Sequence, residues 1–409
     1  MKNKKLILFT SQFPYGMGET FLETEISFLS EVFDEVQIFA TAVNTFEARF
    51  VPENVRFSVF SEELSRIEKL VALTAIFSKD YQEEKRRSKQ AYGLKWTRKR
   101  RNTALVSLAR ARKITKMLGD FCGNNLNEQV VLYSYWCNDS AIGLGLFCRS
   151  HPSVEAVTRV HGWDLYFEAT PFNYLPFRAL IAEHLSLFPI SSKGESYIKD
   201  RWKVDPVRIE IARLGTKNVQ KIGGRSERNV LVSCSNLIPL KRVSLIAKAL
   251  IFLKDIQLDW YHFGDGVERQ VIENILKEIP SDHIQVHLMG RKKNVEILNW
   301  YSQNNPDLFV NVSTTEGIPV SIMEAMSFGI PVFATDVGGT SEIVNNENGQ
   351  LLQVDISAKE LSERIRAFFL SPNDFREAVS VKAFETWKSE YNAEANYTKF
   401  AQALIRMGK

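Results

Sequence analysis

Residues 308–344 read LFVNVSTTEGIPVSIMEAMSFGIPVFATDVGGTSEIV. This stretch opens with the short apolar run Leu308 to Val312 and contains a second run from Pro331 to Ala334, and runs of this kind are typical of buried parallel strands. A polar turn leads from the first run into a helix that we expect to begin near Pro319, because proline is well tolerated in the first turn of a helix. Strand, helix and strand in this order predict an α/β fold.

Apolar runs bounded by turns recur along the rest of the chain. In its first half they lie at Lys5 to Phe9, Val36 to Ala40, Val130 to Tyr133, Val157 to Val160 and Leu185 to Ile190. The second half adds Val230 to Cys234, Leu258 to His262, Ile284 to Leu288, Leu308 to Val312 and Pro331 to Ala334. Helical patterns alternate with these runs, as in residues 21–33, where apolar residues recur at the period of an amphipathic helix. This alternation predicts doubly wound, Rossmann-like sheets.

The length of 409 residues is too great for one ordinary core and favours two domains. Residues 217–228, KNVQKIGGRSER, carry glycines and charges with little apolar content, as a linker does. We therefore predict an N-terminal domain over residues 1–216 and a C-terminal domain over 229–409, whose terminal helix is free to pack back on the first domain. Since open α/β sheets bind ligands at the carboxyl ends of their strands, we expect the two domains to face each other across a cleft.

Composition and cysteine usage are those of a soluble intracellular protein. Apolar residues make up 44% of the chain and charged residues 24%. Four cysteines without a C-x-x-C pair or metal-ligand spacing indicate buried free thiols: Cys122, Cys137, Cys148 and Cys234. The apolar run near the N-terminus is too short for a signal segment or a membrane span, so a cytoplasmic location is expected.

Two glutamates flank the expected start of the helix near Pro319. Glu316 lies just before it and Glu324 about one turn inside it. A helix N-terminus binds phosphate through its free amides and its dipole, and two carboxylates beside it can hold a sugar hydroxyl and a ribose diol. An exposed loop glutamate and a solvated helix glutamate are the alternative for any arbitrary pair.

The surrounding string decides between these interpretations. EGIPVSIMEAMSFGIPVFATDVGGTSEIV resembles glycosyltransferase family 4, retaining enzymes of the GT-B fold with a Glu-x7-Glu motif, in a context like EGxxxxxxEAMAxGxPVIAtdvgGxxEiV. The resemblance implies that Glu316 contacts the donor sugar and Glu324 the nucleotide ribose. It also implies donor contacts from the segment between them: Gly317, Ile318, Val320 and Ser321. Pro319 departs from the family, where many members have a glycine, and it offers no amide.

A second part of the resemblance concerns the donor diphosphate. SCSNLIPLKRVSLIAKAL, residues 233–250, is similar to the family's first C-terminal strand–helix unit, and Lys241 matches the lysine that binds the diphosphate. Arg242 stands at the next position and Asn236 replaces the usual arginine. Lys241 and Arg242 could instead be surface charges, but cations are disfavoured at a helix N-terminus unless an anion sits there.

Further motifs complete the predicted site. RVHGWDLY is similar to the family's HG-x-D element, which implies an active-site role for His161 and Asp164. HFGDG is a weaker match to the turn near the nucleotide base and places Gly264 there. The loop PYGMGET, with Gly16 and Gly18, corresponds to a glycine-containing turn facing the phosphates and acceptor, and a plain tight turn explains it equally well.

Catalysis is expected to need neither a metal nor another cofactor, apart from the sugar nucleotide as co-substrate. The chain contains no Asp-x-Asp and no cluster with metal-ligand spacing. Lys241, Arg242 and helix amides would then neutralise the departing diphosphate. The resemblance implies retention by attack on the same face of the sugar, with the phosphate helping to deprotonate the acceptor.

One strongly basic segment stands apart from an otherwise acidic chain. Between Lys85 and Lys116 there are thirteen basic residues and no Asp or Glu. Trp96 lies among Lys95, Arg98, Lys99, Arg100 and Arg101, a composition that suits contact with an anionic membrane or a lipid-linked acceptor. A solvated helical surface is the plainer interpretation. RNA binding is disfavoured because no aromatic-rich nucleic-acid module is visible, so no nucleic acid partner is expected.

Together these features predict a retaining transferase that moves a hexose from a UDP- or GDP-sugar to a glycan or lipid-linked glycan in surface-polysaccharide biosynthesis. It would act in the cytoplasm, peripheral to the inner face of the plasma membrane. The alternative is a catalytically silent GT-B subunit that binds or scaffolds a partner, as the departures at Asn236 and Pro319 suggest. A sugar-nucleotide epimerase of the same fold is less consistent with the string after Glu324.

Overall fold

The chain folds into two compact α/β units in the computed structural model. The structure describes residues 4–16, 18–123, 129–218, 220–224, 226–279 and 283–407, so Met17 of the glycine loop and Val219 and Arg225 of the predicted linker lie outside the described residues. Unit 1 comprises Met1–Leu214 together with Glu394–Lys409, and unit 2 comprises Gly215–Ala393. The chain therefore returns to unit 1 after completing unit 2.

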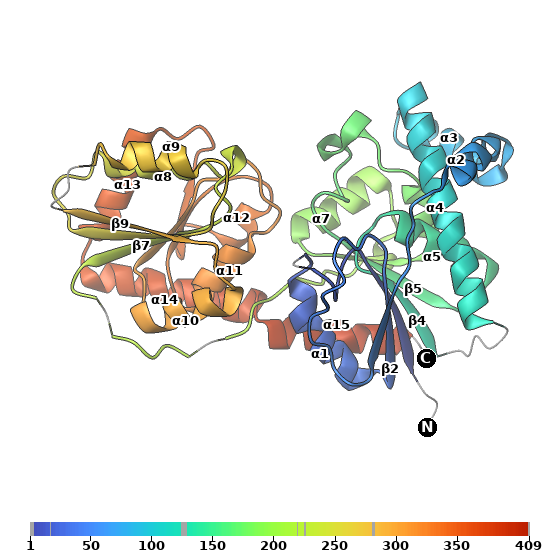
Figure 1. Ribbon diagram of the computed structural model, residues 1–409, viewed down its shortest axis with the longest axis horizontal. Coiled ribbons are helices and arrows are strands. Elements are labelled where there is room, and N and C mark those ends of the chain that lie inside the picture. The colour runs from blue at the N-terminus through green and yellow to red at the C-terminus, as the bar shows by residue number, and fades with distance from the viewer. Residues whose placement is uncertain are drawn as a thin grey trace. The chain divides into compact units, whose positions relative to one another are not determined.

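Unit 1 is built on a six-stranded parallel sheet in the order β3-β2-β1-β4-β5-β6 (Figure 1). Its strands are β1 (Lys5–Thr10), β2 (Glu35–Ala40), β3 (Val55–Val59), β4 (Val130–Ser134), β5 (Glu155–Val160) and β6 (Ser186–Pro189). Its helices are α1 (Phe21–Val32), α2 (Arg66–Thr74), α3 (Lys79–Gln90), α4 (Arg98–Cys122), α5 (Asp139–Ser150), α6 (Arg178–His184), α7 (Ser192–Tyr197) and α15 (Ala393–Met407).

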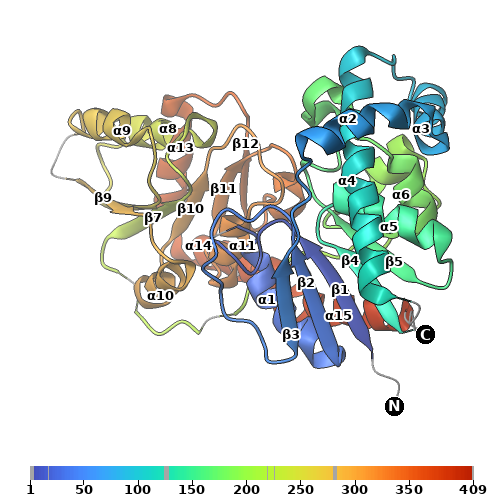
Figure 2. The same cartoon turned by 45° about the vertical axis from the view of Figure 1, so that its right-hand side comes forward.

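Alternate residues of β1 face opposite layers of this unit. Leu6 and Leu8 join a core with residues of α1 and α15, whereas Ile7 and Phe9 join a core with residues of α4 and α5. Figure 2 shows these two pairs of helices on opposite sides of the sheet. A strand that is buried on both faces reads as a continuous apolar run, which is why LILF was recognisable in the sequence.

Unit 2 repeats the architecture, with the sheet order β12-β11-β10-β7-β8-β9. Its strands are β7 (Asn229–Cys234), β8 (Leu258–Phe263), β9 (Ile284–Gly290), β10 (Leu308–Asn311), β11 (Val332–Thr335) and β12 (Gly349–Leu352). Its helices are α8 (Val243–Leu250), α9 (Arg269–Leu276), α10 (Asn294–Asn304), α11 (Val320–Ser327), α12 (Thr340–Ile343), α13 (Ala358–Phe369) and α14 (Asn373–Glu390). Figure 1 shows α8, α9 and α13 on one face of this sheet and α10, α11 and α14 on the other.

Both sheets reverse their strand order at the same relative position. The reversal lies between β1 and β4 in unit 1 and between β7 and β10 in unit 2. At such a point the loops that leave the two neighbouring strands diverge to opposite faces, which opens a crevice at the carboxyl ends of the strands. Each unit therefore has one place where its fold favours ligand binding.

The prediction of two doubly wound α/β units is confirmed, and the ten predicted strands are present. Two edge strands, β3 and β12, were missed because VRFSV mixes charged and apolar residues and GQLL is short and begins with glycine. Residues 217–228 carry few apolar side chains, but among the described ones the amides of Ile222 and Gly223 donate to the carbonyl of Ser302 in unit 2.

A buried polar network connects α15 with the face of the unit 1 sheet that carries Leu6 and Leu8. Arg159 on β5 and Glu25 on α1 are fully buried, with Arg159 Nη2 3.0 Å from Glu25 Oε2. The hydroxyl of Tyr133 donates to Glu25 Oε1 over 2.9 Å, and the guanidinium lies over the ring of Phe400, 4.2 Å from its centroid. Arg159 Nη1 also donates to the carbonyl of Ala212 over 2.7 Å.

Replacing Arg159 by methionine should lower the free energy of unfolding of unit 1 by about 3–5 kcal/mol, because the substitution leaves the Glu25 carboxylate buried without its cation. Urea unfolding of the full chain measures this change. Arg112→Met is the matched control, since Arg112 forms a surface pair with Asp80, which keeps Arg149 as a partner. Equal destabilisation by the two variants would contradict a structural role for the buried pair.

Candidate active site

Glu316 is held by several donors in the turn between β10 and α11. Its Oε1 accepts hydrogen bonds from Lys241 Nζ and Ser313 Oγ, each over 2.6 Å, and from Asn311 Nδ2 over 3.3 Å. The side chain of Glu316 is 12% exposed and that of Lys241 is 24% exposed. The carboxylate is therefore fixed in position while part of it faces solvent.

Lys241 reaches Glu316 from the other side of the strand reversal in unit 2. It ends the short 3-10 turn Pro239–Lys241 that follows β7, whereas Glu316 follows β10. These two strands are neighbours in the sheet. The structure thus brings together two residues that the sequence predicted separately, at the point where an open α/β sheet binds ligands.

Glu324 lies one turn inside α11 in a more enclosed environment. It is buried, and its Oε1 accepts a hydrogen bond of 2.6 Å from Asn294 Nδ2 at the start of α10. Burial raises the pKa of Glu324 to about 7, an effect that the hydrogen bond from Asn294 partly opposes. Asn294 was not predicted, because nothing in the sequence around it points to a residue thirty positions away.

The turn between Glu316 and α11 packs against the glycines of the DVGG string. The amide of Gly339 donates to the carbonyl of Gly317 over 2.8 Å. Gly338 has a φ of 56°, and a Cβ there would lie 1.8 Å from the carbonyl oxygen of Glu316. Only glycine fits such an approach. These two glycines of the motif thus shape the turn that carries Glu316.

The remaining predicted donor residues lie around the start of α11. Pro319 immediately precedes the helix, with a φ of −70°, and no side chain caps it. Ile318 is buried, Gly317 is exposed, and Val320 and Ser321 are partly exposed in the first turn. Amides of a first turn have no partner within their helix, so those of Val320 and Ser321 are suited to an anion.

Arg242 braces neighbouring loops. It has a left-handed backbone with a φ of 48°, its Nε donates to the carbonyl of Val312 over 2.7 Å, and its Nη1 donates to that of Val354 over 2.6 Å. Burial lowers the pKa of Arg242 below its ordinary value. Two of its five N–H donors are thus used on protein carbonyls, and Nη2 is buried without a hydrogen-bond partner among the described residues. Asn236 is exposed.

Gly264 in HFGDG is required by backbone packing. Its φ is 144°, and a Cβ there would lie 1.8 Å from the carbonyl oxygen of Ser235. The preceding His262 is buried between Ser233 and the Ser235 carbonyl, and burial lowers its pKa to about 4. This histidine is therefore neutral, and the loop after β8 is held close to the loop after β7.

In unit 1, Asp164 fastens the loops that follow β4 and β5. It is fully buried, and its two oxygens accept hydrogen bonds from the amides of His161, over 2.6 Å, and Cys137, over 2.7 Å. Arg178 bonds to the carbonyls of Cys137 and Asp164. Asp164 was predicted beside His161 as an active-site acid, but this geometry makes it a positioning residue that does not reach solvent.

His161 lies at the end of β5 within an aromatic cluster. Its ring centroid is 4.3 Å from that of Trp136 and 4.8 Å from that of Tyr135, and Trp163 lies against Trp136 at 5.3 Å. His161 is 6% exposed and both ring nitrogens lack a hydrogen-bond partner within the described residues, whereas Trp163 is 52% exposed. A buried polar group normally has a partner, so a ligand hydroxyl is a fitting one.

An internal carboxylate occupies the loop that follows β1. Glu19 accepts hydrogen bonds of 2.7–2.8 Å from three successive amides, those of Ser11, Gln12 and Phe13. It also accepts a bond of 2.6 Å from the indole of Trp136, across the strand reversal of this sheet. These amides are therefore already used.

The predicted Gly16 and Gly18 belong to the same loop. Gly16 has a φ of 62°, and its amide donates to the carbonyl of Glu47. The carbonyl of Gly18 accepts from Arg49. Glu19 and Trp136 were missed, although Glu19 stands directly after Gly18 in the PYGMGET string.

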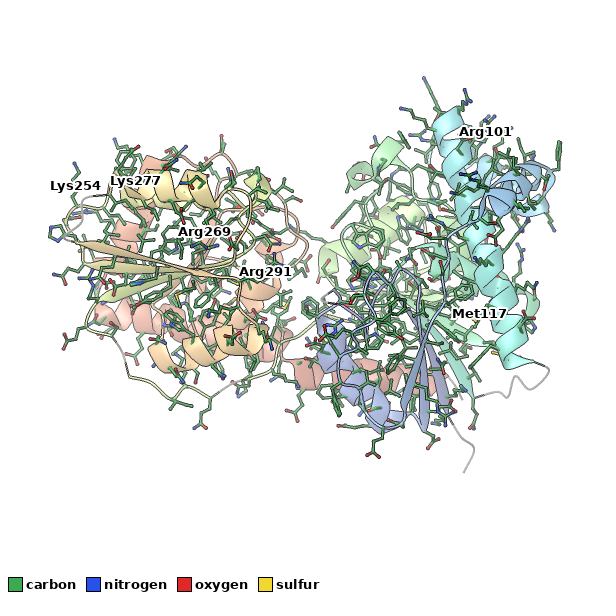
Figure 3. The ribbon with its side chains drawn as sticks, in the orientation of Figure 1. Arg101, Met117, Lys254, Arg269, Lys277 and Arg291 are labelled. Atoms are coloured by element: carbon green, nitrogen blue, oxygen red, sulfur yellow. The ribbon has the colours of Figure 1, made fainter. Side chains whose placement is uncertain are left out.

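The basic segment is mostly helical, and Trp96 is only partly exposed. Trp96 is partly buried against the core, its indole donates to the hydroxyl of Tyr81, and its ring packs edge-on against Tyr174. In contrast, Arg98, Lys99 and the partly exposed Arg100 and Arg101 occupy the first turn of α4, and Figure 3 shows Arg101 near that end of the helix.

An open hollow of about 520 Å³ beside this turn is lined by Lys95, Lys99, Arg100 and Phe172, among others. Lys99 lies over the Phe172 ring, and Arg100 donates to the carbonyl of Phe172. The cations of the segment thus surround an aromatic side chain other than the predicted Trp96. Over the described residues, no helix is both long and apolar enough to cross a bilayer.

A family model described as glycosyl transferases group 1 matches residues 216–386. Among curated proteins, the chain is 24% identical over 264 residues to the putative colanic acid biosynthesis glycosyltransferase WcaL of Salmonella typhimurium, covering 61% of this chain and 64% of that protein. It is 29% identical over 222 residues to the O-antigen biosynthesis glycosyltransferase WbnH of Escherichia coli, covering 53% and 61%. The matches thus span less than two thirds of these relatives.

Solved glycosyltransferase structures share the whole fold. The lipopolysaccharide outer core galactosyltransferase WaaB, in its apo form, superposes with a TM-score of 0.67 at 14% identity, covering 98% of this chain and 99% of that one. HepE of Anabaena in complex with UDP gives 0.66 at 14% identity, covering 98% and 100%. Residues 216–386 therefore match the glycosyl transferases group 1 family, and the chain has the GT-B fold.

Proposed function

We propose that the protein is a retaining glycosyltransferase that uses a nucleotide-diphosphate sugar, with UDP as the favoured nucleotide. The observation that carries this proposal is the grouping of Glu316, Lys241 and Glu324 at the strand reversal of unit 2. These three residues lie within residues 216–386, which match the group 1 family model, and structures of HepE with the same fold hold UDP and UDP-glucose.

In this proposal unit 2 binds the donor through groups of opposite charge. Glu316 accepts a hydroxyl of the donor sugar and Glu324 accepts the ribose diol, both through charge-assisted hydrogen bonds. Lys241 has three N–H donors, so it can keep its bond to Glu316 and also bond a phosphate oxygen. The amides of Val320 and Ser321 at the start of α11 supply further donors to the phosphates.

The reaction breaks the bond between the anomeric carbon of the sugar and the phosphate oxygen. The diphosphate departs with the electron pair, an acceptor hydroxyl forms the new bond on the same face, and its proton passes to a phosphate oxygen. Lys241 and the helix amides offset the charge that develops on the diphosphate, so no metal is required. Among the residues that the structure describes, no three His, Cys, Asp or Glu side chains converge as a metal site would need.

Unit 1 supplies the groups for the acceptor. The half-exposed Trp163 offers an aromatic face, on which the C–H face of a sugar ring can pack. Trp163 packs against Trp136, as does the imidazole of His161, whose nitrogens lack a hydrogen-bond partner among the described residues. A glycan is therefore the acceptor that this surface suits. The names of the relatives WcaL and WbnH place them in colanic acid and O-antigen biosynthesis, which supports a surface polysaccharide with a lipid-linked acceptor at the cytoplasmic face of the membrane.

A catalytically silent subunit is the alternative. Asn236 stands where the resembled family has an arginine, and Arg242 uses two of its five N–H donors on protein carbonyls. A silent subunit would bind a partner or scaffold an assembly without turning over a sugar nucleotide. The intact contacts around Glu316 favour an active enzyme over this alternative.

Glu316→Gln should lower the rate of UDP release from the preferred UDP-sugar by about 10²–10³-fold. The neutral amide no longer pairs with the charge of Lys241, and it accepts the hydrogen bond of the donor hydroxyl less strongly than a carboxylate does. The assay measures release of the nucleoside diphosphate, UDP or GDP, from a panel of UDP- and GDP-sugars in EDTA, in which the wild type should remain active. Glu347→Gln, in an exposed loop of the same unit, is the control and should keep the wild-type rate.

Two outcomes of this assay would count against the proposal. Unchanged turnover in Glu316→Gln would remove Glu316 from the site. No turnover by the wild type with any donor, combined with no nucleotide binding in calorimetry, would favour the silent subunit.

The affinity for UDP-glucose should fall about tenfold between pH 8 and pH 6, because Glu324 has a pKa of about 7 and binds the ribose diol best as a carboxylate. Calorimetry with UDP-glucose suits this test, since its diphosphate has no proton that titrates in this range. Glu324→Gln should bind weakly and show no such pH dependence.

The same titration has the opposite sign for folding. Because the pKa of Glu324 is raised in the folded protein, its contribution to stability is present below about pH 4.5 and is lost as the pH rises through 7. The thermal midpoint of the ligand-free wild type should therefore decrease across this interval more than that of Glu324→Gln. Parallel curves for the two proteins would show that Glu324 does not titrate there.

Trp163→Ala should raise the KM for a glycan acceptor about fivefold and leave the Kd for UDP-glucose unchanged, because it removes an aromatic contact worth about 1 kcal/mol. Initial rates with a panel of nitrophenyl hexosides measure the effect. Phe375→Ala is the control, since Phe375 is exposed to a similar extent, 53%, on α14 of unit 2. A change in donor affinity instead would assign Trp163 to the donor.

A further inference from the structure

Helix α2 presents its apolar side chains to solvent. Ile67, Leu70, Val71, Leu73 and Phe77 are 74%, 67%, 60%, 55% and 88% exposed. At 100° per residue these five positions fall on one side of the helix and its following 3-10 turn, whereas the buried Ala72 falls on the other. A surface helix of a globular protein normally turns its apolar stripe inward. We refer to the five side chains as the outward face of α2.

The helix is held in place by polar contacts. Ser65 and Glu68 form a capping box at its start. Glu68 lies 3.6 Å from Lys113 on α4, and Lys113 also donates to the carbonyl of Glu63. At the other end, Gln82 of α3 donates to the carbonyl of Ile76. The outward face therefore contributes little to folding, and its substitution should leave the helix intact.

The charges around the outward face that lack an ion-pair partner are positive. From Arg66 to Lys79 the exposed side chains include the cations Arg66, Lys69 and Lys79, and the carboxylate in this range is Glu68, whose side chain is 42% exposed. Within the described part of the chain, none of these three cations has an ion-pair partner. Glu68, the acid on this helix, is turned toward Lys113. The surface is thus apolar at its centre and cationic at its margins.

We propose that the outward face of α2 docks the protein on an anionic membrane surface. A short helix with a strong apolar face and unpaired basic residues lies in the plane of the interface, with the apolar side chains among the acyl chains and the cations near the headgroups. Trp96, the aromatic expected to do this, is committed to the core through Tyr81. Phe77, in the 3-10 turn that follows α2, is 88% exposed and is available for this role.

The side-chain chemistry favours a bilayer over a protein partner. Protein hot spots are rich in tryptophan, tyrosine and arginine and fill well-packed pockets. The outward face carries aliphatic side chains and one phenylalanine on a single helix, a shape that needs no complementary pocket. Unpaired cations beside such side chains complement anionic headgroups, whereas a second copy of this chain would bring like charges together.

This inference adds a membrane contact to the proposed function. It rests on that function only for the reason why the enzyme acts at a membrane, namely a lipid-linked acceptor. Docking is measured without donor or acceptor. A transferase that does not dock and a docking protein that does not transfer sugar are therefore distinguishable results.

Co-sedimentation of the full chain with phosphatidylcholine vesicles, with and without phosphatidylglycerol, tests the proposal. Ile67→Ser/Leu70→Ser/Phe77→Ser should weaken binding to the mixed vesicles by about tenfold or more. Arg66→Gln/Lys69→Gln/Lys79→Gln should abolish the preference for anionic vesicles. The matched control is Val207→Ser/Ile222→Ser/Val267→Ser, which removes apolar side chains of similar exposure, 84%, 79% and 82%, elsewhere on the surface.

Circular dichroism of each variant checks that the helices are retained. Wild-type vesicle binding by the α2 serine variant, or equal loss in the control, overturns the proposal. So does a concentration-dependent dimer that the serine variant abolishes while vesicle binding persists, because the face would then pair two copies of the chain.

Discussion

Lys241 Nζ lies 2.6 Å from Glu316 Oε1 across the point where the strand order of unit 2 reverses. The loops after β7 and β10 diverge there, and this contact holds their tips together around a partly exposed carboxylate. The constraint recurs in unit 1, where Trp136 after β4 donates to Glu19 after β1 over 2.6 Å. In both units a carboxylate is held between the two loops at the strand reversal. In unit 2, Glu316 is paired with the cation Lys241. In unit 1, Glu19 accepts hydrogen bonds from backbone amides and from the indole of Trp136.

Carboxyl groups of different residues have different roles because their environments differ. Glu316 has several donors and a route to solvent, so it can exchange a protein contact for a ligand contact. Glu324 is enclosed with one amide donor, which makes its charge depend on pH near neutrality. Asp164 bonds two amides in the core and fastens a loop. Burial and partners, more than residue type, therefore separate the groups that can meet a ligand from those that hold the scaffold.

The layered fold was predictable because its strands are apolar on both faces and its helices interrupt them at regular intervals. The Glu316 and Glu324 pair was predictable because it lies within one continuous string. Asn294 was not, since it meets Glu324 through the tertiary fold from a distant position, and the contact between Trp136 and Glu19 likewise joins positions that are far apart in the sequence. Trp96 shows the reverse error: its basic neighbours suggested a surface position, but Tyr81 and Tyr174 enclose it. Sequence composition does not reveal which side of a helix faces inward, as α2 also illustrates.

Helix α15 gives the chain an order of assembly. Phe400, Ala401 and Leu404 cover the sheet face formed by Leu6 and Leu8, yet nearly four hundred residues separate the two partners. During synthesis from the N-terminus this face stays uncovered while all of unit 2 is translated. Over the same interval Phe400 is not yet present to pack on the guanidinium of Arg159, the partner of Glu25. Unit 2 is continuous and can fold as soon as it emerges, whereas the unit translated first is completed last. A nascent chain of this protein therefore carries an exposed apolar sheet face while unit 2 is translated, and that interval is when a chaperone has most to protect.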